Sequence, residues 1–174
     1  MHDYWWKVID DMGLGSHFRL ELEQLARRDA CDVNPSKGSL AFLSDAGYAQ
    51  MAINLLPFIQ HLVLKAGDKG LFTIFRIPRA TAQRSGWVHE KTNVRERQVV
   101  AHGRDGGIVV LKHYPANSLA PNEVVNVTGA GDTLVGSVLA SLVQDPCAFH
   151  DPQALDRLAQ EAQKVVSYYY DWFV

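Results

Sequence analysis

The chain has 174 residues, of which 47% are hydrophobic and 21% charged. This ordinary globular composition argues against collagen-like, low-complexity and disordered classes. Seventeen Lys and Arg against 19 Asp and Glu leave a formal charge of −2, so no overall positive field is available to hold nucleic acid. Cys31 and Cys147 lie far apart in sequence, a usage that predicts neither a disulfide scaffold nor a zinc site and favours a reducing compartment.

The N-terminal segment is acidic where a signal peptide would be basic and then apolar. No apolar run approaches the ~18 residues of a membrane span. We therefore expect a soluble cytoplasmic protein with no membrane partner.

Two helices are predicted in the first third of the chain. Residues 16–28 place apolar side chains at helical spacing behind Ser16, and residues 44–56 do so behind Ser44 and end before Pro57. The polar stretch between them contains Asn-Pro and Lys-Gly, which is typical of a loop.

Two hairpins are predicted next. Residues 62–64 and 71–77 are β-rich runs on either side of the tight turn at 67–70, Gly-Asp-Lys-Gly, which favours a hairpin or strand-turn-strand at a sheet edge. Residues 99–102 and 108–111 flank Gly-Arg-Asp-Gly-Gly in the same way.

Residues 76–104 are unusually basic, and the sequence leaves two interpretations open. One is a long solvated excursion between strands; the other is a basic flap near a phosphorylated ligand, because loops of this length are often functional. The basic residues are Arg76, Arg79, Arg84, Lys91, Arg95, Arg97 and Arg104, against Glu90 and Glu96.

The last third predicts two further helices. Residues 131–143 carry two neighbouring apolar lines. These lines are Leu134, Val138 and Leu142, and Val135, Leu139 and Val143. Residues 153–170 repeat the apolar pattern and open at Asp151-Pro152, a cap followed by a first-turn proline. The aromatic tail 167–174 is expected to pack on the core or on a partner.

Residues 124–136, Val-Val-Asn-Val-Thr-Gly-Ala-Gly-Asp-Thr-Leu-Val-Gly, carry most of the chemical information. The first-turn amides of the helix that opens there have no internal partner and lie at its positive end. Gly129, Ala130 and Gly131 present almost no side chain, which predicts an anion hole for a phosphoryl group. Asp132, at its rim, is suited to take a proton from an attacking hydroxyl. The alternative is an N-capped helix whose aspartate satisfies first-turn amides.

Two other phosphate-binding motifs are excluded. A Walker A loop, Gly-x-x-x-x-Gly-Lys-Ser/Thr, occurs nowhere in the chain. The dinucleotide fingerprint needs a third glycine where Leu134 stands, so a phosphate-binding oxidoreductase is not favoured.

Residues 126–136 resemble the signature of the ribokinase-like (PfkB) sugar and nucleoside kinases, in which Gly-Ala-Gly-Asp opens a helix. Residues 65–70, Lys-Ala-Gly-Asp-Lys-Gly, resemble the family's other nucleotide-side turn. The stretches 36–70 and 107–142 are more specifically similar to the kinase domain of eukaryotic pseudouridine-metabolising proteins, which often join it to a pseudouridine-5′-phosphate glycosidase. The resemblance covers roughly residues 5–163.

The resemblance implies an α/β fold of the ribokinase-like three-layer α/β/α type, incomplete at its N-terminus. Residues 1–174 would form a single partial kinase domain, the ATP-side portion, with its motif-bearing core at about 36–163. An Asn-x-x-Glu motif, which that family associates with Mg²⁺, has no convincing counterpart here, so metal ligands stay unassigned.

The resemblance also implies residue roles. Asp132 would be the catalytic base, and Gly129, Ala130 and Gly131 the anion hole. Either lysine of the turn at 65–70 would lie near the phosphates, with a solvated charge as the alternative. Residues 115–122 would border the adenine. Asn126 and Thr128 would line the phosphate side. The lysine near the phosphates would be Lys65 or Lys69. Gly67 and Gly70 would let the backbone approach ATP.

The activity implied is ATP-dependent phosphorylation of a sugar or nucleoside hydroxyl, with pseudouridine as the first candidate. ATP and Mg²⁺ would be required, with a monovalent cation as an option, and an N-terminal half or partner chain would complete the fold. The alternative is a truncated, catalytically inactive kinase remnant that acts as a nucleotide-binding or protein-interaction module. Open sheet edges and exposed apolar surface would favour such association.

Overall fold

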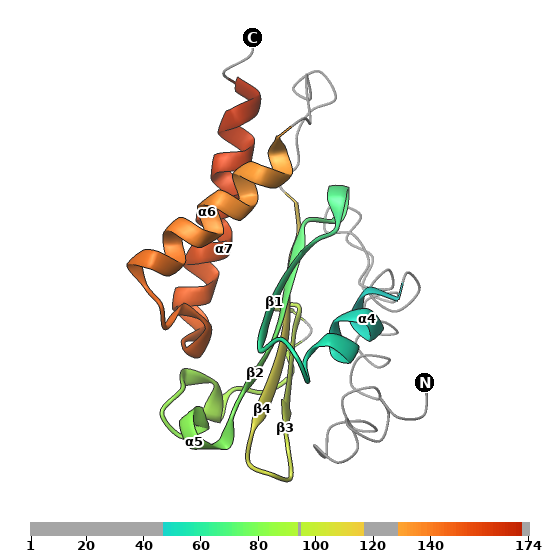
Figure 1. Cartoon of the computed structure of the whole chain (residues 1–174), viewed down its shortest axis with the longest axis vertical. Coiled ribbons are helices and arrows are strands. Elements are labelled where there is room, and N and C mark those ends of the chain that lie inside the picture. The colour runs from blue at the N-terminus through green and yellow to red at the C-terminus, as the bar shows by residue number, and fades with distance from the viewer. Residues whose placement is uncertain (1–46, 94, 117–128, 172–174) are drawn as a thin grey trace. The chain divides into compact units, whose positions relative to one another are not determined.

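The computed structural model (Figure 1) describes residues 47–93, 95–116 and 129–171. The chain divides into two compact units, Met1–Pro115 and Ala116–Val174. The helix predicted over 16–28 and the loop after it lie outside the described residues.

The first described helix of the first unit is α4 (Tyr48–Leu55). Gly47 precedes it in the left-handed conformation, with φ 72°, which glycine adopts at no steric cost. The helix predicted over 44–56 is therefore observed from Tyr48, and it ends before Pro57 as expected. Residues 44–46 lie outside the described residues.

The first predicted hairpin is confirmed. Strand β1 (His61–Lys65) pairs antiparallel with β2 (Leu71–Ile77), and Lys65 lies opposite Leu71. The short helix η1 (Gly67–Lys69) makes the turn. Gly67 and Gly70 have φ of 59° and 93°, so both positions of the turn favour glycine.

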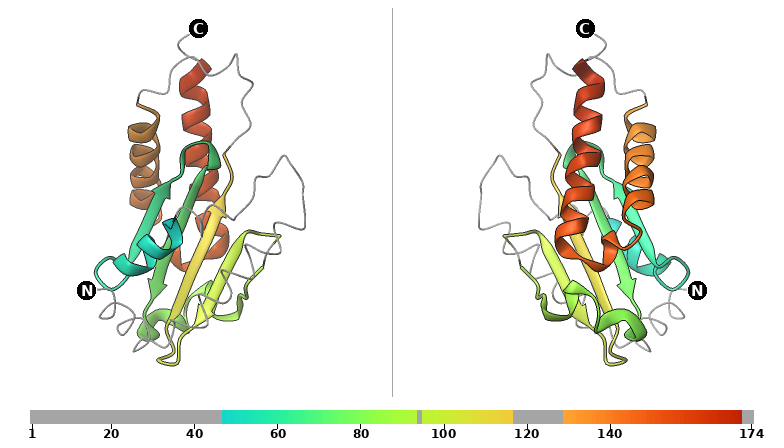
Figure 2. Two further views of the ribbon diagram at one scale, coloured as in Figure 1. Left: turned by 90° about the vertical axis from the view of Figure 1, so that its right-hand side faces the viewer. Right: turned by 90° about the vertical axis from the view of Figure 1, so that its left-hand side faces the viewer.

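The second predicted hairpin is confirmed as well. Strand β3 (Gln98–His102) pairs antiparallel with β4 (Ile108–Tyr114), and β4 pairs antiparallel with β2. The sheet order is β1-β2-β4-β3 (Figure 2). In this four-stranded sheet β1 is an edge strand, as the sequence predicted.

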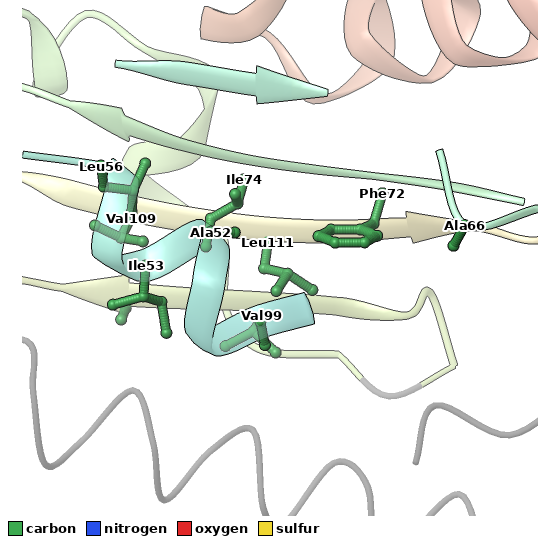
Figure 3. Close-up of a cluster of buried hydrophobic side chains, with 11 residues drawn as sticks. Ala52, Ile53, Leu56, Ala66, Phe72, Ile74, Val99, Val109 and Leu111 are labelled. Carbon is green, nitrogen blue, oxygen red and sulfur yellow. The ribbon is translucent and has the colours of Figure 1, made fainter. Parts of the chain in front are cut away.

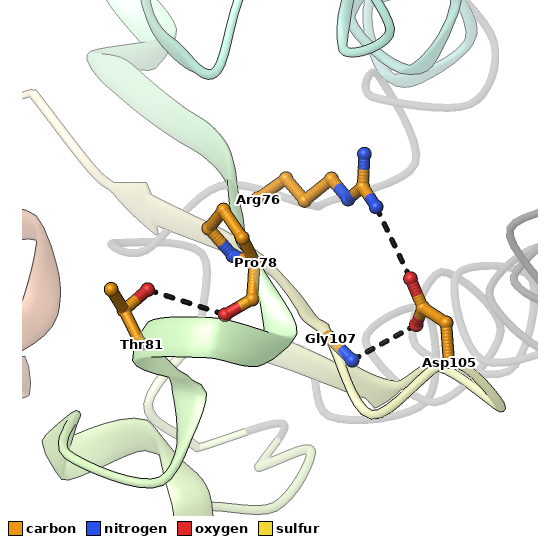
Figure 4. A network of polar contacts seen from close by, with 5 residues as sticks. All are labelled: Arg76, Pro78, Thr81, Asp105 and Gly107. Carbon is orange, nitrogen blue, oxygen red and sulfur yellow. Dashed lines mark hydrogen bonds and ion pairs between the residues drawn. The ribbon is translucent and has the colours of Figure 1, made fainter.

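The β3–β4 turn is closed by side-chain bonds (Figure 4). The Asp105 carboxylate accepts the Gly107 amide at 2.9 Å and pairs with the Arg76 guanidinium at 3.1 Å. One arginine of the basic stretch therefore links β2 to this turn.

One face of the sheet packs on α4 (Figure 3). Strand residues alternate between the two faces, and the apolar residues of this face meet the apolar side of the helix. The buried cluster consists of Ala49, Ala52, Ile53, Leu56, Ala66, Phe72, Ile74, Val99, Ala101, Val109 and Leu111.

The opposite face of the sheet is covered in part by Trp87. This side chain is fully buried and meets the Phe75 ring edge-on, with 5.6 Å between centroids. It comes from the short helix η2 (Gly86–His89), whose N-cap Ser85 accepts the Trp87 amide, and η2 follows α5 (Arg79–Ala82). Residues 78–97 connect β2 to β3, as the first interpretation of this stretch expected, but they are not solvated throughout, because they hold two short helices and a core tryptophan. The basic-flap interpretation stays a prediction.

The second unit contains helices α6 (Ala130–Gln144) and α7 (Pro152–Asp171), which pack against each other, and the short helix η3 (Ala148–His150). Both long helices were predicted. The Asp151 carboxylate accepts the Ala154 amide at 2.7 Å, which confirms the cap expected at Asp151-Pro152.

The two apolar lines of α6 differ in burial. Leu134 and Val138 are buried, whereas Val135, Leu139 and Val143 are 58%, 57% and 82% exposed. Within the ranges that the structure describes, no helix is long and apolar enough to cross a membrane.

Candidate active site

The turn that the sequence predicts as an anion hole lies at the start of α6. Gly129 is the N-cap, with φ 82°, and makes no side-chain capping bond. The Thr133 amide donates to the Gly129 carbonyl at 2.9 Å, which is the first bond of the helix. Amides before Thr133 therefore have no partner within the helix and point toward its N-terminal end. Together with the helix dipole, this arrangement favours an anion.

Asp132 lies in the first turn of α6 and is exposed, whereas Ala130 is buried and Gly131 half-buried. Its carboxylate is therefore available to a bound molecule at the helix start. A negative charge here also offsets the helix dipole, so the capping interpretation remains compatible with the geometry. Asn126 and Thr128 lie outside the described residues, as does most of the stretch 115–122.

The second candidate segment is the turn at the end of β1. Lys65 is exposed at the last position of the strand. Lys69 donates from Nζ to the Asp68 carboxylate at 2.8 Å, and both side chains are exposed. This hydrogen bond and the adjacent positive charge lower the pKa of Asp68 from its ordinary value. Lys69 therefore already has an anionic neighbour, although an exposed pair of this kind is worth little.

The backbone of this turn is tightly bonded. The Ala66 amide donates to the Gly70 carbonyl at 2.7 Å, and the Lys69 and Gly70 amides donate to Ala66 and Gly67 at 3.1 Å each. A Cβ added at Gly67 would meet nothing within 4 Å. The turn is thus ordered, and the space above Gly67 is open to a ligand.

Sequence reasoning missed His113, which contacts this turn from β4. It lies on β4, buried, and its Nε2 lies 2.7 Å from the Lys69 carbonyl oxygen. Its Nδ1 accepts from Arg97 Nε at 2.9 Å. Because 44 residues separate His113 from Lys69, no local pattern could have indicated this contact.

The structure gathers the candidate residues into two groups. Lys65, Gly67, Lys69 and Gly70 share one turn of the first unit, and residues 129–132 share the start of α6 in the second. Among the described residues, no group of three or more His, Cys, Asp or Glu could hold a metal ion.

Comparison with known proteins identifies the family. Residues 63–166 match the model of the pfkB family carbohydrate kinases, a match that spans more than half of the chain and contains both candidate segments. The chain belongs to this family. The family assignment confirms the resemblance seen in the sequence and the ribokinase-like α/β fold class.

One relative is a pseudouridine-metabolizing bifunctional protein of Schizosaccharomyces pombe. It is 24% identical over 141 residues, which cover 81% of this chain and 16% of the relative. The chain thus spans about a sixth of that protein's length. No solved structure matches the chain.

Proposed function

We propose that this chain binds ATP and transfers its γ-phosphoryl group to a hydroxyl of a sugar or nucleoside. Membership of the pfkB family supports a kinase of this general kind, and the name of the S. pombe relative makes pseudouridine the first candidate acceptor. The observation that carries the proposal is the start of α6, where Gly129 gives the helix no side-chain cap and Asp132 is exposed in the first turn.

In the proposed reaction, the Asp132 carboxylate accepts the proton of the acceptor hydroxyl. The hydroxyl oxygen then forms a bond to the γ-phosphorus, while the bond from that phosphorus to the β–γ bridging oxygen breaks and ADP leaves. The amides of Gly129, Ala130 and Gly131 would stabilise charge on the transferring group. Asn126 and Thr128 are proposed to line the phosphate side.

The turn at the end of β1 is proposed to contact the nucleotide. Gly67 and Gly70 would let the backbone approach ATP, and Lys65 or Lys69 would lie near the phosphates. Lys65 is the better candidate, because Lys69 already pairs with Asp68.

Mg²⁺ would enter with ATP and neutralise phosphate charge. This ion usually keeps several waters and needs only one or two carboxylates beside substrate phosphates. The described residues offer no cluster of three donors, so no residue of this chain is assigned to the metal and no step above depends on it. A monovalent cation likewise has no assigned ligand.

We place the reaction in the cytoplasm, where ATP is abundant.

Calorimetric titration with MgATP tests the proposal. We expect roughly micromolar affinity, about −8 kcal/mol, and at least about a tenfold loss in Gly131→Val, because a branched side chain would fill the anion hole. Gly136→Val is the matched control on the same helix, since a Cβ there meets nothing within 4 Å. Absence of heat at millimolar MgATP from a folded chain, or equal losses in the two variants, would contradict nucleotide binding at this turn.

A second candidate function, that of an interaction module, is favoured by one observation. The line Val135, Leu139 and Val143 on α6 is exposed, and Gly136 and Ala140 lie on the same exposed side. Small residues let two helices approach closely, and an exposed apolar line favours association. The occupant that suits an uncharged line of this kind is the same helix of a second copy of this chain.

Sedimentation velocity over about a hundredfold range of concentration tests this second candidate. If α6 mediates self-association, the wild-type chain will grow in mass with concentration and Leu139→Glu will stay monomeric, because a buried unpaired charge is costly. Val165→Glu on α7, also at an exposed apolar position, serves as the control and should associate normally. A wild-type chain that remains monomeric throughout would rule out self-association through α6.

A further inference from the structure

A series of buried hydrogen bonds runs through the first unit from Arg97 to the turn at the end of β1. Arg97 and His113 are only 7% and 3% exposed. Arg97 Nε lies 2.9 Å from His113 Nδ1, and His113 Nε2 lies 2.7 Å from the Lys69 carbonyl oxygen. Because a guanidinium only donates and a carbonyl only accepts, the two partners assign the proton to Nε2 and leave Nδ1 as the acceptor.

The backbone at Arg97 is held in an uncommon conformation. Its φ is 55°, in the left-handed region, and it is the one non-glycine residue with positive φ among those that the structure describes. The His113 amide also donates to the Arg97 carbonyl at 3.0 Å. Two bonds thus join the same pair of residues, and a strained conformation persists where its surroundings over-determine it.

This series of hydrogen bonds ends at the turn at residues 67–70, which has backbone bonds of its own and a further contact from His113. Gly67 and Gly70 both adopt positive φ, and glycines give a free turn many alternative conformations. His113 belongs to β4 and lies opposite Phe72 of β2, so its ring is anchored in the sheet. A bond from that ring to the Lys69 carbonyl selects one conformation of the turn.

We propose that His113 is a positioning residue for this turn: oriented by Arg97, it fixes the backbone of residues 67–70 in the form that a nucleotide would approach. The inference rests on the proposed function for its ligand, MgATP. It does not make His113 a catalytic residue, because the ring is buried and would act through the Lys69 carbonyl.

Two polar substitutions separate the two bonds of His113. Glutamine places its amide nitrogen near the position of Nε2 and can still donate to the Lys69 carbonyl. Asparagine places its oxygen near the position of Nδ1 and can still accept from Arg97, but it cannot reach the turn. The pair His113→Gln and His113→Asn therefore tests which bond matters, with two side chains of similar polarity.

The measurements are amide hydrogen exchange at Lys69 and Gly70 without nucleotide, and calorimetric MgATP affinity. We expect His113→Gln to exchange like the parent and to bind MgATP within about twofold of it. His113→Asn should exchange faster at both amides and bind at least about tenfold more weakly. Parent-like exchange in His113→Asn, or a reversed order of the two variants, would overturn the positioning role.

Two further readouts keep the inference separable from folding and from the proposed function. Imidazole ¹⁵N shifts of the unaltered chain should show a protonated Nε2 and an unprotonated Nδ1, and the opposite tautomer would overturn the proposal even if both variants failed to fold. A parent chain that bound no MgATP would overturn the proposed function, and the exchange rates would still decide whether His113 holds the turn.

Discussion

Asp132 is the residue on which the proposed chemistry depends. It is exposed at the start of α6, so no core packing relies on it, and a carboxylate beside an anion hole would weaken ATP binding rather than strengthen it. Loss of a general base typically lowers the rate by about 10²–10⁴-fold. We therefore predict that Asp132→Asn lowers turnover by about that factor, measured as ADP release with pseudouridine as acceptor, while MgATP affinity is kept or rises.

A matched control lies at the other end of the same helix. Asp145 follows α6, is exposed, and accepts the Cys147 amide at 3.0 Å. An asparagine oxygen can accept the same bond, so Asp145→Asn should leave turnover unchanged. If Asp132→Asn kept more than half of the parent rate, Asp132 would not be the base, and the capping interpretation of this aspartate would stand instead.

At the scale of single elements, local chemistry predicted much of the fold. The two hairpins were found because glycine turns at 67–70 and 103–107 separate β-rich runs, and both turns contain glycine with positive φ. Helix α7 was found from its apolar period and from a cap that forms within three residues. Interactions between neighbours in sequence are enough to specify such elements.

Elements whose structure depends on distant contacts escaped prediction. Nothing near Trp87 in the sequence indicates that it packs on Phe75 of β2, so neither interpretation of residues 76–104, a solvated excursion or a basic flap, includes a core tryptophan. The apolar period of α6 predicted two lines, but a period shows only that residues share a side of the helix, not that this side is covered. Val135 and Leu139 are accordingly exposed.

The candidate site likewise has one part that the local sequence predicts and another that depends on contacts between distant residues. The glycine turn and the helix after it could be predicted because they depend on consecutive residues, and α6 does begin there, with Gly129 as its N-cap and Asp132 in its first turn. The anion-binding role of this turn stays a prediction. The contacts of His113 with Lys69 and with Arg97 could not be predicted, because they join η1, β4 and the residue before β3 only in the folded sheet. The positive φ of Arg97 likewise has no counterpart in the sequence.

At the scale of the whole molecule, ligand binding raises the free energy of unfolding. A ligand that binds only the folded chain at about 100 times its Kd adds about 2.7 kcal/mol to the free energy of unfolding. For a chain of 174 residues this corresponds to a rise of about 5–10 °C in the unfolding midpoint. The same linkage applies to an acceptor, so thermal unfolding can rank acceptors without requiring turnover.

We predict that a non-hydrolysable ATP analogue with Mg²⁺ raises the midpoint by this amount, and that pseudouridine adds a further rise that uridine does not. Uridine is the sharpest control, because it carries the same ribose hydroxyls and differs in having its base linked through nitrogen rather than carbon. Equal shifts with the two nucleosides would show that the base is not read and would remove pseudouridine as the preferred acceptor, while the nucleotide-dependent shift would still support a kinase. A midpoint unmoved by the analogue would contradict nucleotide binding by this chain.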